Sequence, residues 1–101
     1  MTMANPHMDE EDKREQKDEF AIQVAEVLCE VQAILVEKNV AYGNSALEPV
    51  RVFSRASAEE QLLVRIDDKL SRVMRGHEMV GEDTITDLIG YLTLLKIARA
   101  Y

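Results

Sequence analysis

The sequence has few of the residues from which sulfur-based and histidine-based sites are built. Its 101 residues include one cysteine, Cys29, and two histidines, His7 and His77. A single cysteine cannot form an internal disulfide bond or a zinc cluster, and this pattern fits a reducing cytoplasm. Two isolated histidines exclude a histidine-rich metal site. Any bound metal is therefore expected to be an oxygen-liganded cation such as Mg²⁺.

Long apolar runs and an overall basic charge are also missing. No stretch reaches the roughly 18 apolar residues of a membrane-spanning helix, so we expect no membrane partner. The net charge is −7, whereas proteins that bind duplex nucleic acid need a basic surface. The charge is uneven, because residues 1–19 hold seven acids and three bases while residues 51–75 hold six bases and four acids. The basic segment fits a small anionic ligand rather than a duplex.

Apolar residues recur at helical spacing in three segments and predict an all-α protein. After a charged N-terminal tail at 1–19, flexible or the frayed start of a helix, the first helix is expected from Phe20 to about Lys38 or Asn39. Residues 20–101 are then expected to form one helical domain. A chain this short buries a modest share of its surface, which favours a homo-oligomer.

The second and third helices have local start and stop signals. Ser57-Ala58-Glu59-Glu60 is a capping box, and the helix that it begins is expected to end near Gly76. The third helix is expected at about 82–99, after a short turn that favours antiparallel packing against the second. The predicted fold is therefore an antiparallel bundle of three main helices. The expected buried stripe of the second helix comprises Leu62, Leu63, Ile66, Leu70, Val73 and Met74.

Cations cluster on one face of the second helix. Arg65, Lys69 and Arg72 lie four and three residues apart, so they share a face. Arginine binds phosphate through its planar fork and lysine binds it as a compact charge, so these residues are candidates to hold a phosphorylated ligand. The alternative is a solvated face with local ion pairs to Asp68.

Carboxylates gather on the second helix and at the start of the third. Asp68, Glu82, Asp83 and Asp87 are candidate ligands for Mg²⁺, which prefers oxygen donors. The alternative for Glu82 and Asp83 is a role in capping, because acids in a first turn interact favourably with the helix dipole. Asp87 lies a turn further in, where capping does not explain it.

The segment after the first helix carries a third group of candidates. Tyr42 is able to stack on a base, Lys38 precedes it, and Gly43-Asn44 is able to bring backbone amides close to a phosphate. The alternative is that Gly43-Asn44 forms a simple turn. Together with the cations above, these residues predict a nucleotide-binding site formed by Lys38, Tyr42, Gly43, Asn44, Arg65, Lys69 and Arg72.

Three separated blocks carry a family resemblance. They are Lys38 with Tyr42-Gly43-Asn44-Ser45, the run from Arg65 to Arg72, and Glu82-Asp83 with Asp87-Leu88-Ile89-Gly90-Tyr91. In this order they resemble the nucleotide modification associated domain 1 family, found mostly in phage and bacterial proteins. The similarity spans roughly residues 30–98. It implies a role in phage nucleotide metabolism in the cytoplasm of the bacterial host.

The resemblance also implies a mechanism and its alternatives. The helical layout is similar to that of the all-α MazG-type nucleoside triphosphate pyrophosphatases, which bind Mg²⁺ through ExxE and ExxD motifs and split the α–β phosphate link with metal-activated water. This chain departs from the pattern, because Asp68 is flanked by bases and Asp83 and Asp87 are four residues apart. Two alternatives stay open: a non-catalytic sponge for a cyclic nucleotide signal of bacterial antiphage defence, and a structural helical oligomer.

Overall fold

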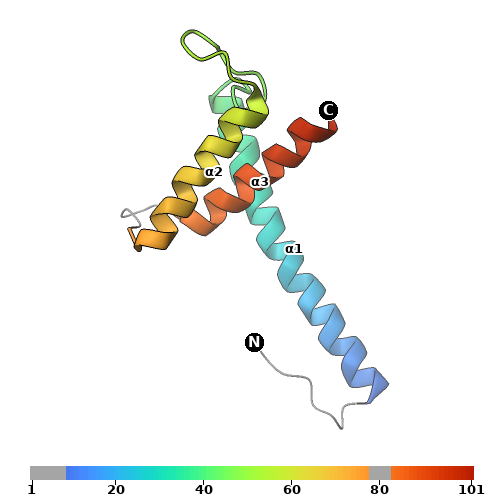
Figure 1. Ribbon diagram of the computed structural model, residues 1–101. Coiled ribbons are helices and arrows are strands. Elements are labelled where there is room, and N and C mark those ends of the chain that lie inside the picture. Colours follow the sequence, from blue (N-terminus) through green and yellow to red (C-terminus); the bar gives the residue numbers. More distant parts are fainter. Residues whose placement is uncertain (1–8, 78–82) are drawn as a thin grey trace. The chain divides into compact units, whose positions relative to one another are not determined.

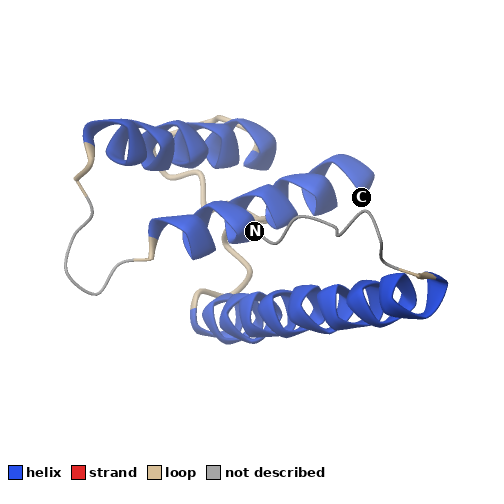
Figure 2. Ribbon diagram, turned by 90° about the horizontal axis from the view of Figure 1, so that it is seen from below, coloured by secondary structure: helices blue, strands red, loops and turns tan. Residues whose placement is uncertain are grey.

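The computed structural model describes residues 9–77 and 83–101. These residues form three α-helices, α1 (Glu10–Ala41), α2 (Ala58–Arg75) and α3 (Thr84–Ala100), and contain no strand (Figures 1 and 2). The predicted all-α fold is confirmed. No helix in the described ranges is both long and apolar enough to cross a bilayer. The chain divides into two units, Met1–Glu30 and Val31–Tyr101.

The described part of the first unit is the beginning of α1. The Asp9 carboxylate accepts a hydrogen bond from the Asp12 N–H at 2.9 Å, and three acids occupy the first turn. Acids at this position interact favourably with the helix dipole, so the helix begins at Glu10 rather than near Phe20. Every side chain from residue 17 to residue 30 is exposed.

In the second unit, α2 begins and ends at the predicted caps, and α3 begins after Asp83, which the alternative interpretation gave as a cap. The Ser57 hydroxyl accepts a hydrogen bond from the Glu60 N–H at 3.1 Å, and Gly76 closes α2 in a left-handed conformation with φ of 67°. Asp83 caps α3 by accepting a hydrogen bond from the Thr86 N–H at 3.0 Å. These starts and stops are local features, which explains why the sequence predicts them closely.

The core of the second unit lies between α2 and α3, which run in roughly opposite directions (Figure 1). Leu62, Ile66 and Leu95 are buried together. Four residues expected in the buried stripe of α2 are exposed instead, namely Leu63 at 38%, Leu70 at 44%, Val73 at 52% and Met74 at 86%. Val73 and Met74 lie near the end of α2, beyond this core cluster. Residues packed partly buried against the core are Ala46, Leu88, Tyr91, Leu94 and Ala98.

The last turns of α1, which belong to the second unit, approach α3 at a glycine. A Cβ atom added at Gly90 would lie 3.1 Å from Leu35 Cδ2. The missing side chain therefore lets the two helices come close together. Val31, at the start of this stretch of α1, is only 5% exposed.

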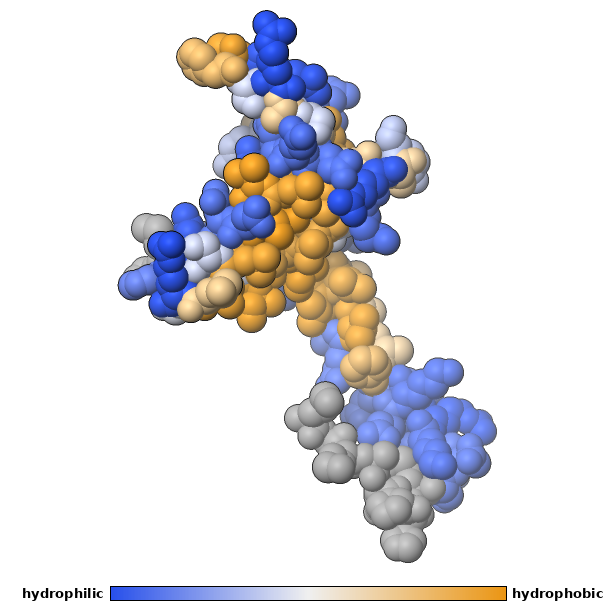
Figure 3. Space-filling view, in the orientation of Figure 1, coloured by the Kyte–Doolittle hydropathy of each residue, from blue (hydrophilic) through white to orange (hydrophobic). Residues whose placement is uncertain are grey.

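Large apolar side chains in the described ranges are more often exposed than buried. Figure 3 shows apolar residues over much of the visible surface of α2 and α3, whereas the first turns of α1 are hydrophilic. Large exposed apolar surfaces mark interaction sites in soluble proteins.

Candidate functional site

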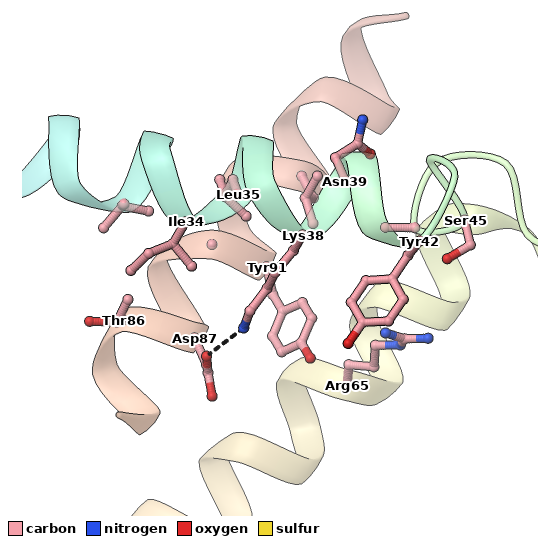
Figure 4. Close-up of a pocket in the computed structure, with 14 residues that line it drawn as sticks. Ile34, Leu35, Lys38, Asn39, Tyr42, Ser45, Arg65, Thr86, Asp87 and Tyr91 are labelled. Carbon is pink, nitrogen blue, oxygen red and sulfur yellow. Dashed lines mark ion pairs between the residues drawn. The ribbon is translucent and has the colours of Figure 1, made fainter. Parts of the chain in front are cut away.

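The second unit contains a pocket of about 340 Å³. The end of α1, the segment that follows it, α2 and α3 each contribute to its wall (Figure 4). Leu35, Gly90 and Leu94 give it an apolar part, and Lys38, Arg65 and Asp87 are the charged residues that line it. Its volume falls in the range of roughly 300 to 1,000 Å³ that is usual for small-molecule sites.

Asp87 is held at the pocket wall by lysines from the two other helices. Its Oδ2 atom lies 3.0 Å from Lys69 Nζ of α2, and its Oδ1 atom lies 3.7 Å from Lys38 Nζ of α1. The side chains of Lys69 and Asp87 are only 13% and 19% exposed, whereas that of Lys38 is 57% exposed. Asp87 is therefore not a solvated carboxylate, and its negative charge is mainly matched by Lys69.

Two tyrosines and an arginine line another part of the pocket. In the view of Figure 4, the rings of Tyr42 and Tyr91 lie between the Lys38–Asp87 ion pair and the guanidinium of Arg65. Tyr91 was not among the predicted site residues. It follows Asp87 by four residues, so both lie on one face of α3, and this spacing is the signal that identifies it.

A tight turn follows α1 at Tyr42, which lines the pocket. The Tyr42 N–H donates to the Lys38 carbonyl at 2.9 Å, and the Asn44 N–H donates to the Asn39 carbonyl at 3.1 Å. Gly43 and Asn44 have φ values of 60° and 61°, in the left-handed region that ends helices. These two residues therefore form the turn that the alternative interpretation proposed, and neither lines the pocket.

The structure brings together only part of the predicted phosphate-binding set. Lys38, Tyr42 and Arg65 line the pocket. Lys69 does not line the pocket. Its Nζ atom instead contacts Oδ2 of Asp87. Arg72, one turn further along α2, is half-buried and also lies outside the pocket wall.

The predicted metal ligands have separate roles where the structure describes them. Asp68 is exposed on α2, and Glu82 lies outside the described residues. Asp83 accepts hydrogen bonds from the Thr86 hydroxyl and the Thr86 N–H, and these bonds lower its pKa. Within 9–77 and 83–101, no group of three or more histidine, cysteine or acidic side chains is placed to hold a metal ion. The Mg²⁺ site formed by Asp68, Glu82, Asp83 and Asp87 therefore stays a prediction.

No protein-family model matches the chain, and comparisons with curated proteins and with solved structures found no significant match. The resemblance to the nucleotide modification associated domain 1 family therefore stays a prediction. The geometry of the pocket in the second unit is the observation from which a function is argued.

Proposed function

We propose that this protein binds a nucleotide in the pocket of the second unit. The observation that carries the proposal is the convergence of aromatic and cationic side chains from separate segments on one partly apolar pocket. Tyr42 and Tyr91 offer aromatic rings, which stack on any nucleobase. Arg65 offers a guanidinium, whose planar fork binds phosphate oxygens in pairs.

The charges around the pocket support an anionic ligand. Lys69 is close to Asp87 and mostly buried, so it offsets the negative charge of that carboxylate. Lys38 is more exposed, and its 3.7 Å contact with Asp87 is longer than the roughly 2.7 to 2.9 Å of a charge-assisted hydrogen bond. Its ammonium group is therefore available to a ligand. Lys38 and Arg65 together leave the pocket positive, as a phosphate group requires.

The pocket volume supports a compact ligand. About 340 Å³ is at the lower end of the range for small-molecule sites. This size favours a mononucleotide over a larger cyclic dinucleotide. The proposed ligand class is therefore a nucleoside phosphate whose base stacks on a tyrosine and whose phosphate reaches Lys38 or Arg65.

The arrangement supports binding better than hydrolysis. A pyrophosphohydrolase of the MazG type needs several carboxylates around Mg²⁺, and in the described residues Asp83 caps α3 while Asp87 faces lysines. We therefore assign no catalytic step to these residues. Lys38 and Arg65 line the pocket, and the one carboxylate that lines it, that of Asp87, already contacts lysines. This arrangement favours the alternative in which the protein sequesters a nucleotide and releases it unchanged.

The test is binding of nucleoside mono- and triphosphates and of cyclic nucleotides, measured by isothermal titration calorimetry with and without Mg²⁺. Chromatography of the supernatant and of the heat-denatured protein then shows whether the ligand is intact. We expect at least one nucleotide to bind and to be recovered unchanged. Products that form only with Mg²⁺ would instead support the enzyme, and no binding of any nucleotide would overturn the proposal.

Matched variants locate the site. Arg65→Ala is expected to weaken binding about tenfold or more, because a charge-assisted hydrogen bond contributes roughly 1.5 to 3 kcal/mol. Arg55→Ala removes the same charge from an exposed position in the loop before α2 that does not line the pocket. It is expected to leave the affinity unchanged. An equal loss in both variants would mean that the anion is attracted by the general charge of this region rather than held in the pocket.

A further inference from the structure

The pocket of the second unit has two cationic ends, and only one of them also carries a carboxylate. At the Asp87 end, Asp87 Oδ1 lies 3.7 Å from Lys38 Nζ, and both residues line the pocket. At the Arg65 end, no ion pair among the described residues involves the arginine. In the view of Figure 4, the two tyrosine rings lie between these ends. The two ends therefore offer a ligand different chemistry.

The two carboxylate oxygens of Asp87 have different surroundings. Oδ2 lies 3.0 Å from Nζ of Lys69, a residue that does not line the pocket. Oδ1 faces Lys38 at 3.7 Å, which is longer than the roughly 2.7 to 2.9 Å of a charge-assisted hydrogen bond. A carboxylate oxygen from which a ligand excludes water needs a hydrogen-bond donor in its place. A ligand that fills the pocket therefore has to bring an N–H or O–H group to Oδ1.

A phosphate group fits the Arg65 end better than the Asp87 end. Beside Asp87, a phosphate would be repelled by the carboxylate and would compete with it for Lys38. At the other end it meets a guanidinium whose planar fork binds two oxygens. Arg65 is exposed, so the remaining phosphate oxygens stay in water.

Tyr91 indicates which part of the ligand reaches Asp87. The two residues are four apart on α3, so they share a face of the helix, and both line the pocket. A nucleobase stacked on the Tyr91 ring therefore lies beside the carboxylate. Proteins commonly recognise a base in this way, by stacking on its face and hydrogen bonds to its Watson–Crick edge.

We propose that the nucleotide lies in the pocket in one direction, with its phosphate on Arg65 and an edge of its base on Asp87 and Lys38. This inference rests on the nucleotide binding proposed above. Asp87 Oδ1 offers an acceptor and Lys38 Nζ a donor beside it. The Watson–Crick edge of each common base places an N–H donor next to an acceptor, so it is able to bond both groups.

The affinity for a nucleotide divided by that for its nucleoside measures the contribution of the phosphate. Calorimetry with adenosine, guanosine, cytidine and uridine and with their 5′-monophosphates gives this ratio. Arg65→Ala is expected to lower the ratio about tenfold or more, because it removes a charge-assisted hydrogen bond to the phosphate. Lys38→Met is expected to weaken nucleotide and nucleoside equally and so to leave the ratio unchanged. A ratio that falls in Lys38→Met as much as in Arg65→Ala would overturn the proposed direction.

Asp87→Asn tests the other end through the sign of its effect. A phosphate beside Asp87 would bind more tightly once this negative charge is removed. The proposed direction predicts the opposite, a loss of about fivefold or more in affinity for the monophosphate, because the acceptor for the base loses its charge. Asp67→Asn makes the same change at an exposed position outside the pocket and is expected to leave the affinity unchanged. Unchanged or tighter binding by Asp87→Asn would overturn the proposal.

Removing the ribose hydroxyls separates the base from the sugar as the donor to Asp87. The 2′,3′-dideoxynucleoside monophosphates are expected to bind as tightly as the ribonucleotides, and a loss equal to that in Asp87→Asn would overturn the assignment of the base edge.

Circular dichroism shows whether each variant is folded. The side chain of Lys38 is 57% exposed, so Lys38→Met keeps the direction testable even if Asp87→Asn does not fold. No binding of any nucleotide by the wild type would overturn the proposed function itself. Binding with the ratio or the sign reversed would overturn only the direction.

Discussion

The two units of this chain contain parts of the same helix with the same apolar spacing, yet the burial of these parts differs. Phe20 in the first unit is 65% exposed, whereas Val31 in the second is 5% exposed. Periodic apolar residues are thus enough to form a helix, but burial requires a complementary surface. The second unit supplies one in α3, where Gly90 lets Leu35 approach closely.

This difference separates two sources of stability. The second unit is stabilised by a core and an ion pair within one chain, so its unfolding should not depend on protein concentration. The described part of the first unit has no buried side chain, so its helix depends on its own backbone hydrogen bonds rather than on a core. Mutations in each region test this contrast.

The largest expected effect is that of Leu62→Ala in the core of the second unit. Leu62 is 1% exposed, and truncating a buried leucine leaves a cavity that costs about 3 kcal/mol of the free energy of unfolding. Urea unfolding followed by circular dichroism measures this cost, which should be the same at low and high protein concentration.

Phe20→Ala provides the comparison from the first unit. It is expected to change the free energy of unfolding of the second unit by less than about 0.5 kcal/mol. If Phe20→Ala destabilised the second unit as much as Leu62→Ala does, the contrast between the two units would be wrong.

A smaller effect is expected from Asp87→Asn, which removes the charge between Lys69 and Lys38. The mostly buried ammonium of Lys69 then loses the carboxylate that lies 3.0 Å away, at a cost of about 2 kcal/mol. Asp68→Asn removes a charge from an exposed position of α2 and should change stability by less than about 0.5 kcal/mol. The two variants are compared by urea unfolding in the presence of a chelator.

The same pair of variants distinguishes two roles for Asp87. A carboxylate that serves only as a metal ligand does not stabilise the metal-free protein. An Asp87→Asn variant as stable as the wild type under chelation would therefore contradict the ion-pair role and favour the metal site that the sequence predicts.

The sequence predicts the local features of this protein better than the direction of its side chains. Ser57, Gly76 and Asp83 delimit α2 and α3 because a cap depends on neighbouring residues alone. The early start of α1 was missed because its acidic first turns have no apolar periodicity, although Asp9 provides a cap. An acidic helix start of this kind can be predicted only from its capping residue, here Asp9.

The sequence predicts some of the residues that line the pocket, such as Lys38, Tyr42 and Arg65, but not others, such as Tyr91. Arg65 and Lys69 share a face of α2, yet Arg65 lines the pocket and Lys69 contacts Asp87. Spacing along one helix cannot separate these two roles, because the position of α3 decides which cation meets a carboxylate. The spacing of four residues places Tyr91 on the same face of α3 as Asp87, but only the packing of α3 shows that this face lines the pocket.

The smallest expected effect concerns the first turn of α3, the helix that gives the second unit its complementary surface. Hydrogen bonds from the Thr86 hydroxyl and N–H lower the pKa of Asp83 below its ordinary value of 3.8. The ionised cap therefore stabilises the folded state above that pH, and this contribution is lost as the pH falls through the lowered pKa. Asp83→Ser keeps a cap of the kind that Ser57 provides but does not titrate. Urea unfolding across this acidic range should show a weaker pH dependence in Asp83→Ser than in the wild type. An unchanged pH dependence would mean that α3 does not rely on the charge of its cap, because the serine hydroxyl offers the same acceptor without the carboxylate.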